Sequence, residues 1–126
     1  MTKELKSRVS GQIDALRDDM IAWSTFIHDH PELGHKEFKA CELLTSQLKR
    51  HGFAVEKGIA GLPTAFRATF HGGGDGPAVA FLAEYDALPD LGHACGHNLI
   101  GTASVGAGIA LSKIIRDLKG SVVVLG

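Results

Sequence analysis

The first half of the chain carries the apolar spacing of two amphipathic helices. Between residues 3 and 28, apolar side chains recur every three or four positions, which places them on one stripe of a helix. They are Leu5, Val9, Ile13, Leu16, Met20, Trp23 and Ile27. Pro31 ends this helix, because proline lacks an amide hydrogen and disfavours helical backbone in the residue before it. The spacing returns over residues 35–51 with Phe38, Cys41, Leu44 and Leu48, and Gly52 follows at the expected C-cap.

The pattern after Gly52 predicts strands followed by a buried helix. Residues 53–56, 64–70 and 78–84 have the composition of strands, and the glycine-rich residues 71–77 form a loop between the two longer ones. Residues 99–118 are apolar almost all round and contain many small side chains, which predicts a buried helix that approaches a sheet closely. Gly120 ends this helix, and residues 121–125 are continuously apolar, as in a parallel strand.

The order of these elements predicts an α/β fold. A strand, a buried helix and a second apolar strand form a βαβ unit, and helices precede it. Parallel sheets are covered on both faces, and the chain ends at Gly126, directly after a strand that should be internal. We therefore expect residues 1–126 to form the N-terminal part of a larger three-layer αβα domain.

Composition excludes several function classes. The 126 residues hold 13 basic and 14 acidic side chains, a formal net charge of −1, which predicts no nucleic-acid partner. The longest weakly polar stretch, residues 99–111, is shorter than the ~20 residues of a membrane span, so no membrane partner is expected. The charged N-terminus does not resemble a secretory signal, and two cysteines cannot form a disulfide scaffold. These features predict a cytoplasmic protein.

The candidate chemistry lies between residues 84 and 98, where the chain leaves a strand and enters the buried helix. Ligands bind beyond the carboxyl ends of strands in open α/β sheets. Cys95 and His97 flank Gly96, and in an extended segment their side chains would project to one side and converge on one ion. A thiolate and an imidazole suit Zn²⁺, nearby carboxylates could orient the imidazole, and the helix N-terminus favours the thiolate.

Other interpretations of these residues compete with a metal site. An isolated Cys-x-His pattern is weak by itself, and Cys95 could instead be a nucleophile for acyl transfer, although His97 is badly placed to deprotonate it. Cys41 lies on an apolar stripe, which favours a buried core thiol. His28, His30 and His35 could form a second metal patch, but turn and capping roles are favoured. The glycine-rich segments lack the residues of a phosphate-binding motif.

Two motifs resemble the M20 family of metallopeptidases and amidohydrolases. His-Ala-Cys-Gly-His-Asn at 93–98, preceded by Glu-Tyr-Asp-Ala-Leu-Pro at 84–89, is similar to the family signature. His-Pro-Glu-Leu-Gly-His-Lys-Glu at 30–37 and Gly-Leu-Pro-Thr-Ala-Phe at 61–66 resemble further motifs of the M20D branch. This branch includes enzymes similar to aminobenzoyl-glutamate hydrolase, plant auxin-conjugate hydrolases and PM20D2-like dipeptidases. The resemblance covers essentially the whole chain.

The resemblance implies a hydrolase of amide bonds with two divalent metal ions, Zn²⁺ or Mn²⁺. By position, Cys95 and His97 match metal ligands, Asp86 matches a carboxylate that orients the histidine or supports the site, and His93 matches a position not usually assigned as a ligand. The branch more often has Asp-Met-Asp at 84–86 and Asp at 98. The residues present here resemble the aminobenzoyl-glutamate-like and PM20D2-like subset. Expected substrates are N-acyl amino acids, small dipeptides and aminobenzoyl-glutamate-like amides.

The resemblance also implies functional parts that these residues do not contain. In the family, the general-base glutamate and the next ligand follow the strand corresponding to residues 121–125, and later come further ligands and an inserted lid domain that often dimerises. We therefore expect the 126-residue chain alone to be inactive. The alternatives are a non-catalytic segment that binds metal weakly and an assembly module that pairs through an uncovered sheet edge.

Overall fold

A mixed four-stranded sheet organises the computed structural model, which describes residues 2–126. The strands are β1 (Ala54–Lys57), β2 (Phe66–His71), β3 (Ala78–Leu82) and β4 (Ser121–Leu125), in the order β1-β2-β4-β3. β4 pairs in parallel with β3 and antiparallel with β2, which itself pairs antiparallel with β1. The strand 121–125 is therefore internal, as its continuous apolar sequence predicted. The sheet is mixed because β2 runs antiparallel to both of its neighbours, whereas β3 and β4 are parallel.

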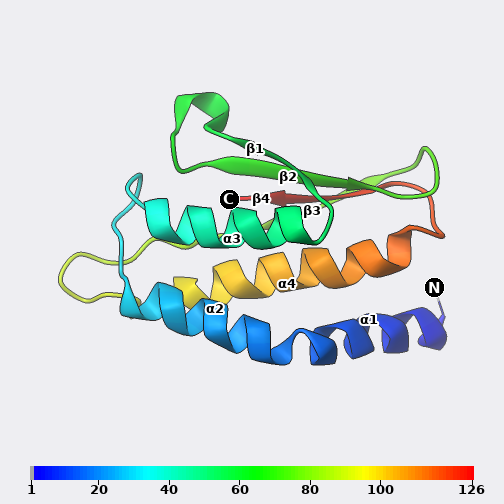
Figure 1. Ribbon diagram of the computed structural model, residues 1–126, viewed down its shortest axis with the longest axis horizontal. Coiled ribbons are helices and arrows are strands. Elements are labelled where there is room, and N and C mark those ends of the chain that lie inside the picture. Colours follow the sequence, from blue (N-terminus) through cyan, green and yellow to red (C-terminus); the bar gives the residue numbers. More distant parts are fainter. Residues whose placement is uncertain (1) are drawn as a thin grey trace.

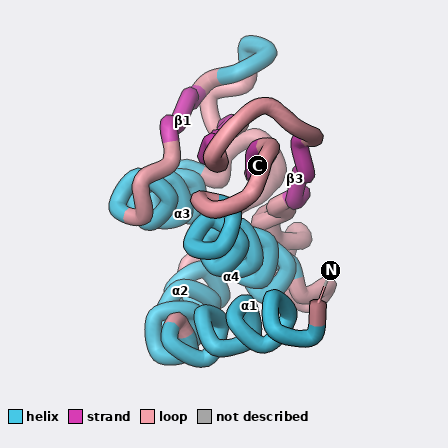
Figure 2. Tube along the Cα trace, turned by 90° about the vertical axis from the view of Figure 1, so that its right-hand side faces the viewer, coloured by secondary structure: helices cyan, strands magenta, loops and turns pink. Residues whose placement is uncertain are grey.

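Four helices lie on one side of this sheet (Figure 1). They are α1 (Lys3–Ala15), α2 (Arg17–Asp29), α3 (Phe38–Arg50) and α4 (His97–Ile115), and a short 3₁₀ helix spans Ile59–Gly61. The view along the layers shows α3 and α4 against the sheet, with α1 and α2 beyond α4 (Figure 2). The predicted α/β class and the β3-α4-β4 unit are confirmed. Within residues 2–126 no helix covers the opposite sheet face, so this part supplies two of the three expected layers.

The central helix α4 is buried between the sheet and the N-terminal helices. Val105 and Ile109 are fully buried, as are Val122 and Val124 of β4. The helix has 19 residues, so it is longer than the weakly polar stretch at 99–111, and its length and composition would suffice to cross a membrane. Most of the apolar part of this helix is buried inside the structure, which is typical of the core helix of a packed domain.

The predicted helix over residues 3–28 is divided at Leu16. This residue leaves the regular helical backbone, with φ −90° and ψ −1°, between α1 and α2. The apolar stripe continues across the break, and Leu16, Trp23 and Ile27 are buried, whereas Leu5, Val9 and Ile13 are only half-buried. Periodicity reports which face is apolar, and both helices turn that face toward α4, so the pattern could not reveal the break.

A carboxylate from the preceding loop caps α3. The oxygens of Glu32 accept hydrogen bonds from the amides of Lys39 and Ala40, at 3.0 Å each. These amides belong to the first turn of the helix, where no backbone carbonyl is available to them. The apolar stripe predicted for α3 is buried at Cys41, Leu44 and Leu48, but Phe38 is 57% exposed, because it lies at the first turn beyond the core.

Small residues allow α4 to approach the sheet, and two glycines make this testable. A Cβ on Gly108 would lie 2.6 Å from Cγ2 of the fully buried Val124, which cannot move away. A Cβ on Gly106 would meet only the flexible end of Met20. Alanine favours a helix by about 1 kcal/mol over glycine, and overpacking a core costs about 1–3 kcal/mol.

We predict that Gly108→Ala lowers the free energy of unfolding by up to about 2 kcal/mol, because the clash outweighs the gain in helix propensity. Gly106→Ala should leave this free energy unchanged or raise it by up to about 1 kcal/mol. Urea denaturation followed by circular dichroism measures both. Equal destabilisation by the two substitutions would show that the contact with Val124 does not limit the packing of α4.

Candidate metal centre

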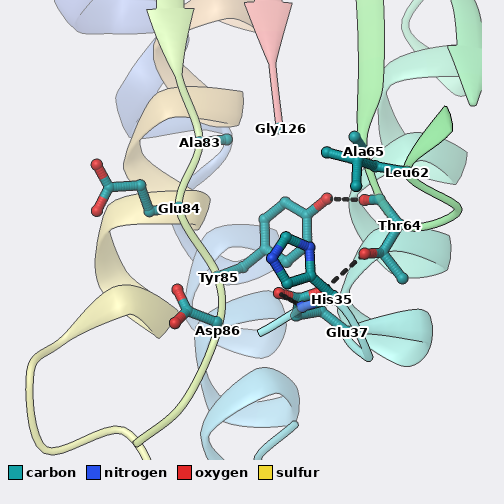
Figure 3. A pocket seen from close by; sticks show the side chains of 10 residues that line it. All are labelled: His35, Glu37, Leu62, Thr64, Ala65, Ala83, Glu84, Tyr85, Asp86 and Gly126. Carbon is teal, nitrogen blue, oxygen red and sulfur yellow. Dashed lines mark hydrogen bonds between the residues drawn. The ribbon is translucent and has the colours of Figure 1, made fainter. Parts of the chain in front are cut away.

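The chain beyond β3 continues in an extended course that separates acidic from aromatic side chains. Glu84 and Asp86 project to one side of this segment, while Tyr85 projects to the other (Figure 3). Tyr85 is 5% exposed and lies against the core, whereas the side chains of Glu84 and Asp86 are 58% and 40% exposed. This alternation is that of a strand, so the sequence Glu-Tyr-Asp places two carboxylates together at the carboxyl end of β3.

His97, the first residue of α4, lies between these two carboxylates. Its Nδ1 is 2.7 Å from Oδ1 of Asp86 and 3.1 Å from the Asp86 carbonyl oxygen. Its Nε2 is 3.0 Å from Oε2 of Glu84. The structure thus brings the predicted residues Asp86 and His97 into direct contact. A carboxylate on one ring nitrogen fixes the orientation of the ring and directs the other nitrogen outward, as in metal sites.

Close packing of α4 against this segment holds His97 in place. A Cβ on Gly101 would lie 2.9 Å from the carbonyl oxygen of Glu84, so only glycine allows this approach. The Ser104 hydroxyl donates a hydrogen bond of 2.6 Å to the carbonyl of Leu82. At the start of the helix, the Asn98 side-chain amide donates to the Ser24 carbonyl of α2 at 3.3 Å. His97 is therefore held where α4 packs against both α2 and the segment that follows β3.

Cys95 lies on a turn directly before α4 rather than on an extended segment. Gly96 has φ +83°, a left-handed conformation that reverses the chain before the helix begins. The prediction that Cys95 and His97 lie on an extended segment and project to one side of it is therefore wrong. Both residues nevertheless lie at the N-terminus of α4. The Cys95 thiol is exposed. Within residues 2–126, no group of three or more His, Cys, Asp or Glu side chains is arranged to hold a metal ion.

His93 is a buried residue of this loop whose environment the sequence did not reveal. It is 8% exposed, and neither ring nitrogen has a hydrogen-bond partner within residues 2–126. Burial lowers the pKa of His93, and the neighbouring His28 and His97 lower it further. The ring is therefore neutral at neutral pH. Its centroid is 6.5 Å from that of His28, so a histidine of α2 also faces this loop.

A buried polar network borders the site on the side of Tyr85 (Figure 3). Glu37 is 8% exposed and accepts hydrogen bonds from the Thr64 hydroxyl at 2.6 Å and the His35 amide at 2.7 Å. The Tyr85 hydroxyl donates to the Thr64 carbonyl. Burial raises the pKa of Tyr85, and Cys41 beside it adds to this effect, so the hydroxyl stays protonated. His35, Glu37, Thr64 and Tyr85 line a cavity of about 220 Å³. Asp86 also borders this cavity.

This network assigns structural roles to the two motifs at 30–37 and 61–66. Glu32 caps α3, and Glu37 joins the loop before α3 to Thr64 before β2. His30 Nδ1 bonds to the Phe26 carbonyl at 2.8 Å, near the end of α2. The favoured capping role of His30 is thereby confirmed. Cys41 is 3% exposed, which confirms the predicted core thiol.

The donor chemistry of the site fits a divalent metal, and the set is partial. His97 is oriented by Asp86 and has its second nitrogen turned toward an exposed carboxylate, while Cys95 adds an accessible thiol at a helix N-terminus. Thiolate, imidazole and carboxylate are the ligands of Zn²⁺ sites in proteins. Catalytic sites of this kind use at least three protein ligands, so the described residues could supply only part of such a site.

Sequence comparison finds hydrolases of amide and peptide bonds, although no protein-family model matches the chain. It is 37% identical over 132 residues to one of the p-aminobenzoyl-glutamate hydrolase subunits of Escherichia coli K12, covering 91% of this chain and 27% of that protein. It is 39% identical over 134 residues to the Xaa-Arg dipeptidase of Mus musculus, covering 97% and 31%. The chain therefore spans about a third of the length of these relatives.

Structural comparison agrees with these similarities. A dinuclear metal-binding peptidase of the M20 family from Bacillus subtilis superposes with a TM-score of 0.79 at 27% identity, covering 89% of this chain and 35% of that structure. An aminohydrolase-like structure from Staphylococcus aureus gives a TM-score of 0.83 over 94% of this chain and 34% of its own. Its identity of 24% supports the fold alone.

The two thiols should differ in reactivity. Burial raises the pKa of the Cys41 thiol, so at neutral pH it is protonated as well as inaccessible, while Cys95 is exposed. Because the thiolate is the reactive form, we predict that a thiol reagent such as DTNB modifies one cysteine in the native chain and two after unfolding. Cys95→Ala should remove the native reaction. Rapid modification of two thiols in the folded chain would contradict the burial of Cys41.

Proposed function

Because the chain belongs to the M20 family of peptidases and amidohydrolases over the part that it covers, we propose that it supplies one side of the metal site of an amide-bond hydrolase. Proposed substrates are N-acyl amino acids, small dipeptides and aminobenzoyl-glutamate-like amides. The single observation that carries the proposal is His97, held by Asp86 at 2.7 Å with its second nitrogen directed away from that carboxylate. A cytoplasmic location and a homodimeric complete enzyme accompany it as proposals.

The residues of this chain would bind and orient the metal. His97 would bind through Nε2, because Nδ1 is occupied by Asp86, and the exposed Cys95 would bind through its sulfur. A pair of Zn²⁺ or Mn²⁺ ions, when bound, polarises a carbonyl and lowers the pKa of bound water. Asp86 keeps the imidazole in one orientation through its contact with Nδ1.

The relatives support this proposal. The Escherichia coli protein is named as a hydrolase of p-aminobenzoyl-glutamate and the mouse protein as a dipeptidase of Xaa-Arg, so both names specify amide or peptide bonds. The Bacillus subtilis structure is described as a dinuclear metal-binding peptidase. Since the chain spans about a third of each, further ligands and the general base would come from residues outside it.

A second candidate function is that of a non-catalytic segment. The uncovered face of the sheet and the edge strand β3, where Leu82 is 62% exposed, would favour pairing with further chain or with another copy. In that case the isolated 126 residues would bind metal weakly and catalyse nothing. Hydrolysis by the purified chain that disappears in Cys95→Ala would exclude this candidate.

We predict that the purified chain retains Zn²⁺ after dialysis against the metal, and that Cys95→Ala and His97→Ala each lower its affinity at least about tenfold. Elemental analysis after gel filtration measures the metal content. Cys41→Ala is the matched control, because it removes a thiol that is buried in the core and inaccessible to a metal ion in solution. Equal metal content in the wild type, Cys95→Ala and His97→Ala would contradict the assignment of both ligands.

A protein of full family length containing this segment should hydrolyse aminobenzoyl-glutamate or Xaa-Arg dipeptides. A chelator should abolish this activity, and Zn²⁺ or Mn²⁺ should restore it, because the metal activates water. Release of the amine product measures the rate. Turnover that a chelator leaves unchanged would contradict metal-dependent hydrolysis.

A further inference from the structure

The contact between His97 and Glu84 is not explained by the role of Asp86. The Nδ1 nitrogen of His97 faces two acceptors, the carbonyl and carboxylate oxygens of Asp86, so it carries a hydrogen. The other ring nitrogen, Nε2, is the one that the proposed function assigns to the metal. It lies 3.0 Å from a carboxylate oxygen of Glu84. A metal ion bound to Nε2 would therefore have this carboxylate oxygen within reach.

The surroundings of Glu84 offer no side-chain cation other than the imidazole. Within residues 2–126, no lysine or arginine forms an ion pair with Glu84; its single ion-pair partner is His97. The Glu84 side chain is 58% exposed and that of His97 is 21% exposed, so an ion can reach the space between them from solvent. Tyr85 fixes the backbone between the two acidic residues, since its ring is buried and its hydroxyl is bonded.

The distance between the two atoms suits a shared metal. Nitrogen and oxygen ligands lie about 2.0–2.2 Å from Zn²⁺, and in a tetrahedral site two such ligands are about 3.3 Å apart. The observed 3.0 Å differs from this by a few tenths of an ångström, which a small rotation of the exposed Glu84 side chain supplies. Asp86 cannot take this role while it is bonded to Nδ1, on the other side of the ring.

We propose that Glu84 is a ligand of the metal that His97 binds through Nε2. Glu84 and His97 then give the chain an adjacent pair of donors, carboxylate and imidazole, where the segment after β3 meets the start of α4. The inference rests on the proposed function, since it concerns the same metal. It assigns the first acidic residue of Glu-Tyr-Asp to the metal and the second to the orientation of the histidine, so the two carboxylates have different roles.

Cobalt spectroscopy tests this assignment directly. Co²⁺ is titrated into the wild-type chain and into Glu84→Gln, Glu84→Asp and Glu56→Gln, and both the affinity and the d–d absorption band are recorded. Glu56 is a matched control, because its side chain is also 58% exposed but pairs with Arg67 on the sheet. Circular dichroism verifies that each variant keeps the fold. The His97→Ala variant reports the imidazole site independently of Glu84.

Glu84→Gln should weaken Co²⁺ binding at least about tenfold, the lower end of the loss seen for partners of metal ligands, and should change the d–d band, which reports the ligand set. Glu84→Asp should keep the band, because it keeps a carboxylate, and Glu56→Gln should bind within about twofold of the wild type. Weakened binding with an unchanged band would overturn the inference, because Glu84 would then only position His97.

Failure of this inference can be separated from failure of the proposed function. If His97→Ala abolishes Co²⁺ binding while Glu84→Gln binds normally with an unaltered spectrum, the inference is wrong and the proposed metal site stands. If the wild-type chain binds no Co²⁺, both the Glu84 assignment and the metal binding proposed for this chain are wrong. The hydrolase proposal is then decided by the chelator experiment on the protein of full family length.

Discussion

The hydrogen bond between Asp86 and His97 is the constraint on which the site depends. It joins the chain beyond β3 to the first residue of α4, at a distance of 2.7 Å between Oδ1 and Nδ1. The two ends of the loop between Asp86 and His97 therefore lie next to each other. The exposed residues of this loop, including Cys95, are held beside the carboxyl end of β3. Without this bond, the histidine ring would be free to rotate and would present either nitrogen to a ligand.

The rest of the fold keeps these two residues in register. α4 runs antiparallel to the strands of its βαβ unit and lies close to β4 because Gly108 leaves no side chain against Val124. At the site end, Gly101 allows the helix to approach the carbonyl of Glu84. On the other side, buried Tyr85 ties the segment to Thr64 and, through it, to Glu37. The buried polar network of Glu37, Thr64 and Tyr85 thus supports the exposed carboxylates of Glu84 and Asp86.

Much of this arrangement could be predicted from the sequence, and the exceptions have physical causes. Apolar periodicity located the helices and strands, and the small residues of the helix predicted over 99–118 indicated a close helix–sheet contact; the helix spans His97–Ile115 in the structure. Spacing could not predict the turn at Cys95, because Gly96 adopts φ +83° and reverses the chain. It also could not identify the burial of His93 or the contact of Glu84 with His97, since both depend on how α2 and α4 pack around the loop. The motif at 84–97 contains Glu84, Asp86 and His97, which the structure brings together, but the contacts of each carboxylate with the imidazole require the three-dimensional arrangement.

The central claim is that Asp86 holds His97 so that Nε2 is available to a metal. The most direct measurement is ¹⁵N NMR of the His97 imidazole in the chain before and after addition of Zn²⁺, with Asp86→Asn as comparison. The account predicts a protonated Nδ1 in both states and a Zn²⁺-dependent shift of Nε2, which Asp86→Asn weakens. Binding of Zn²⁺ through Nδ1, or imidazole resonances that Zn²⁺ leaves unchanged, would contradict it.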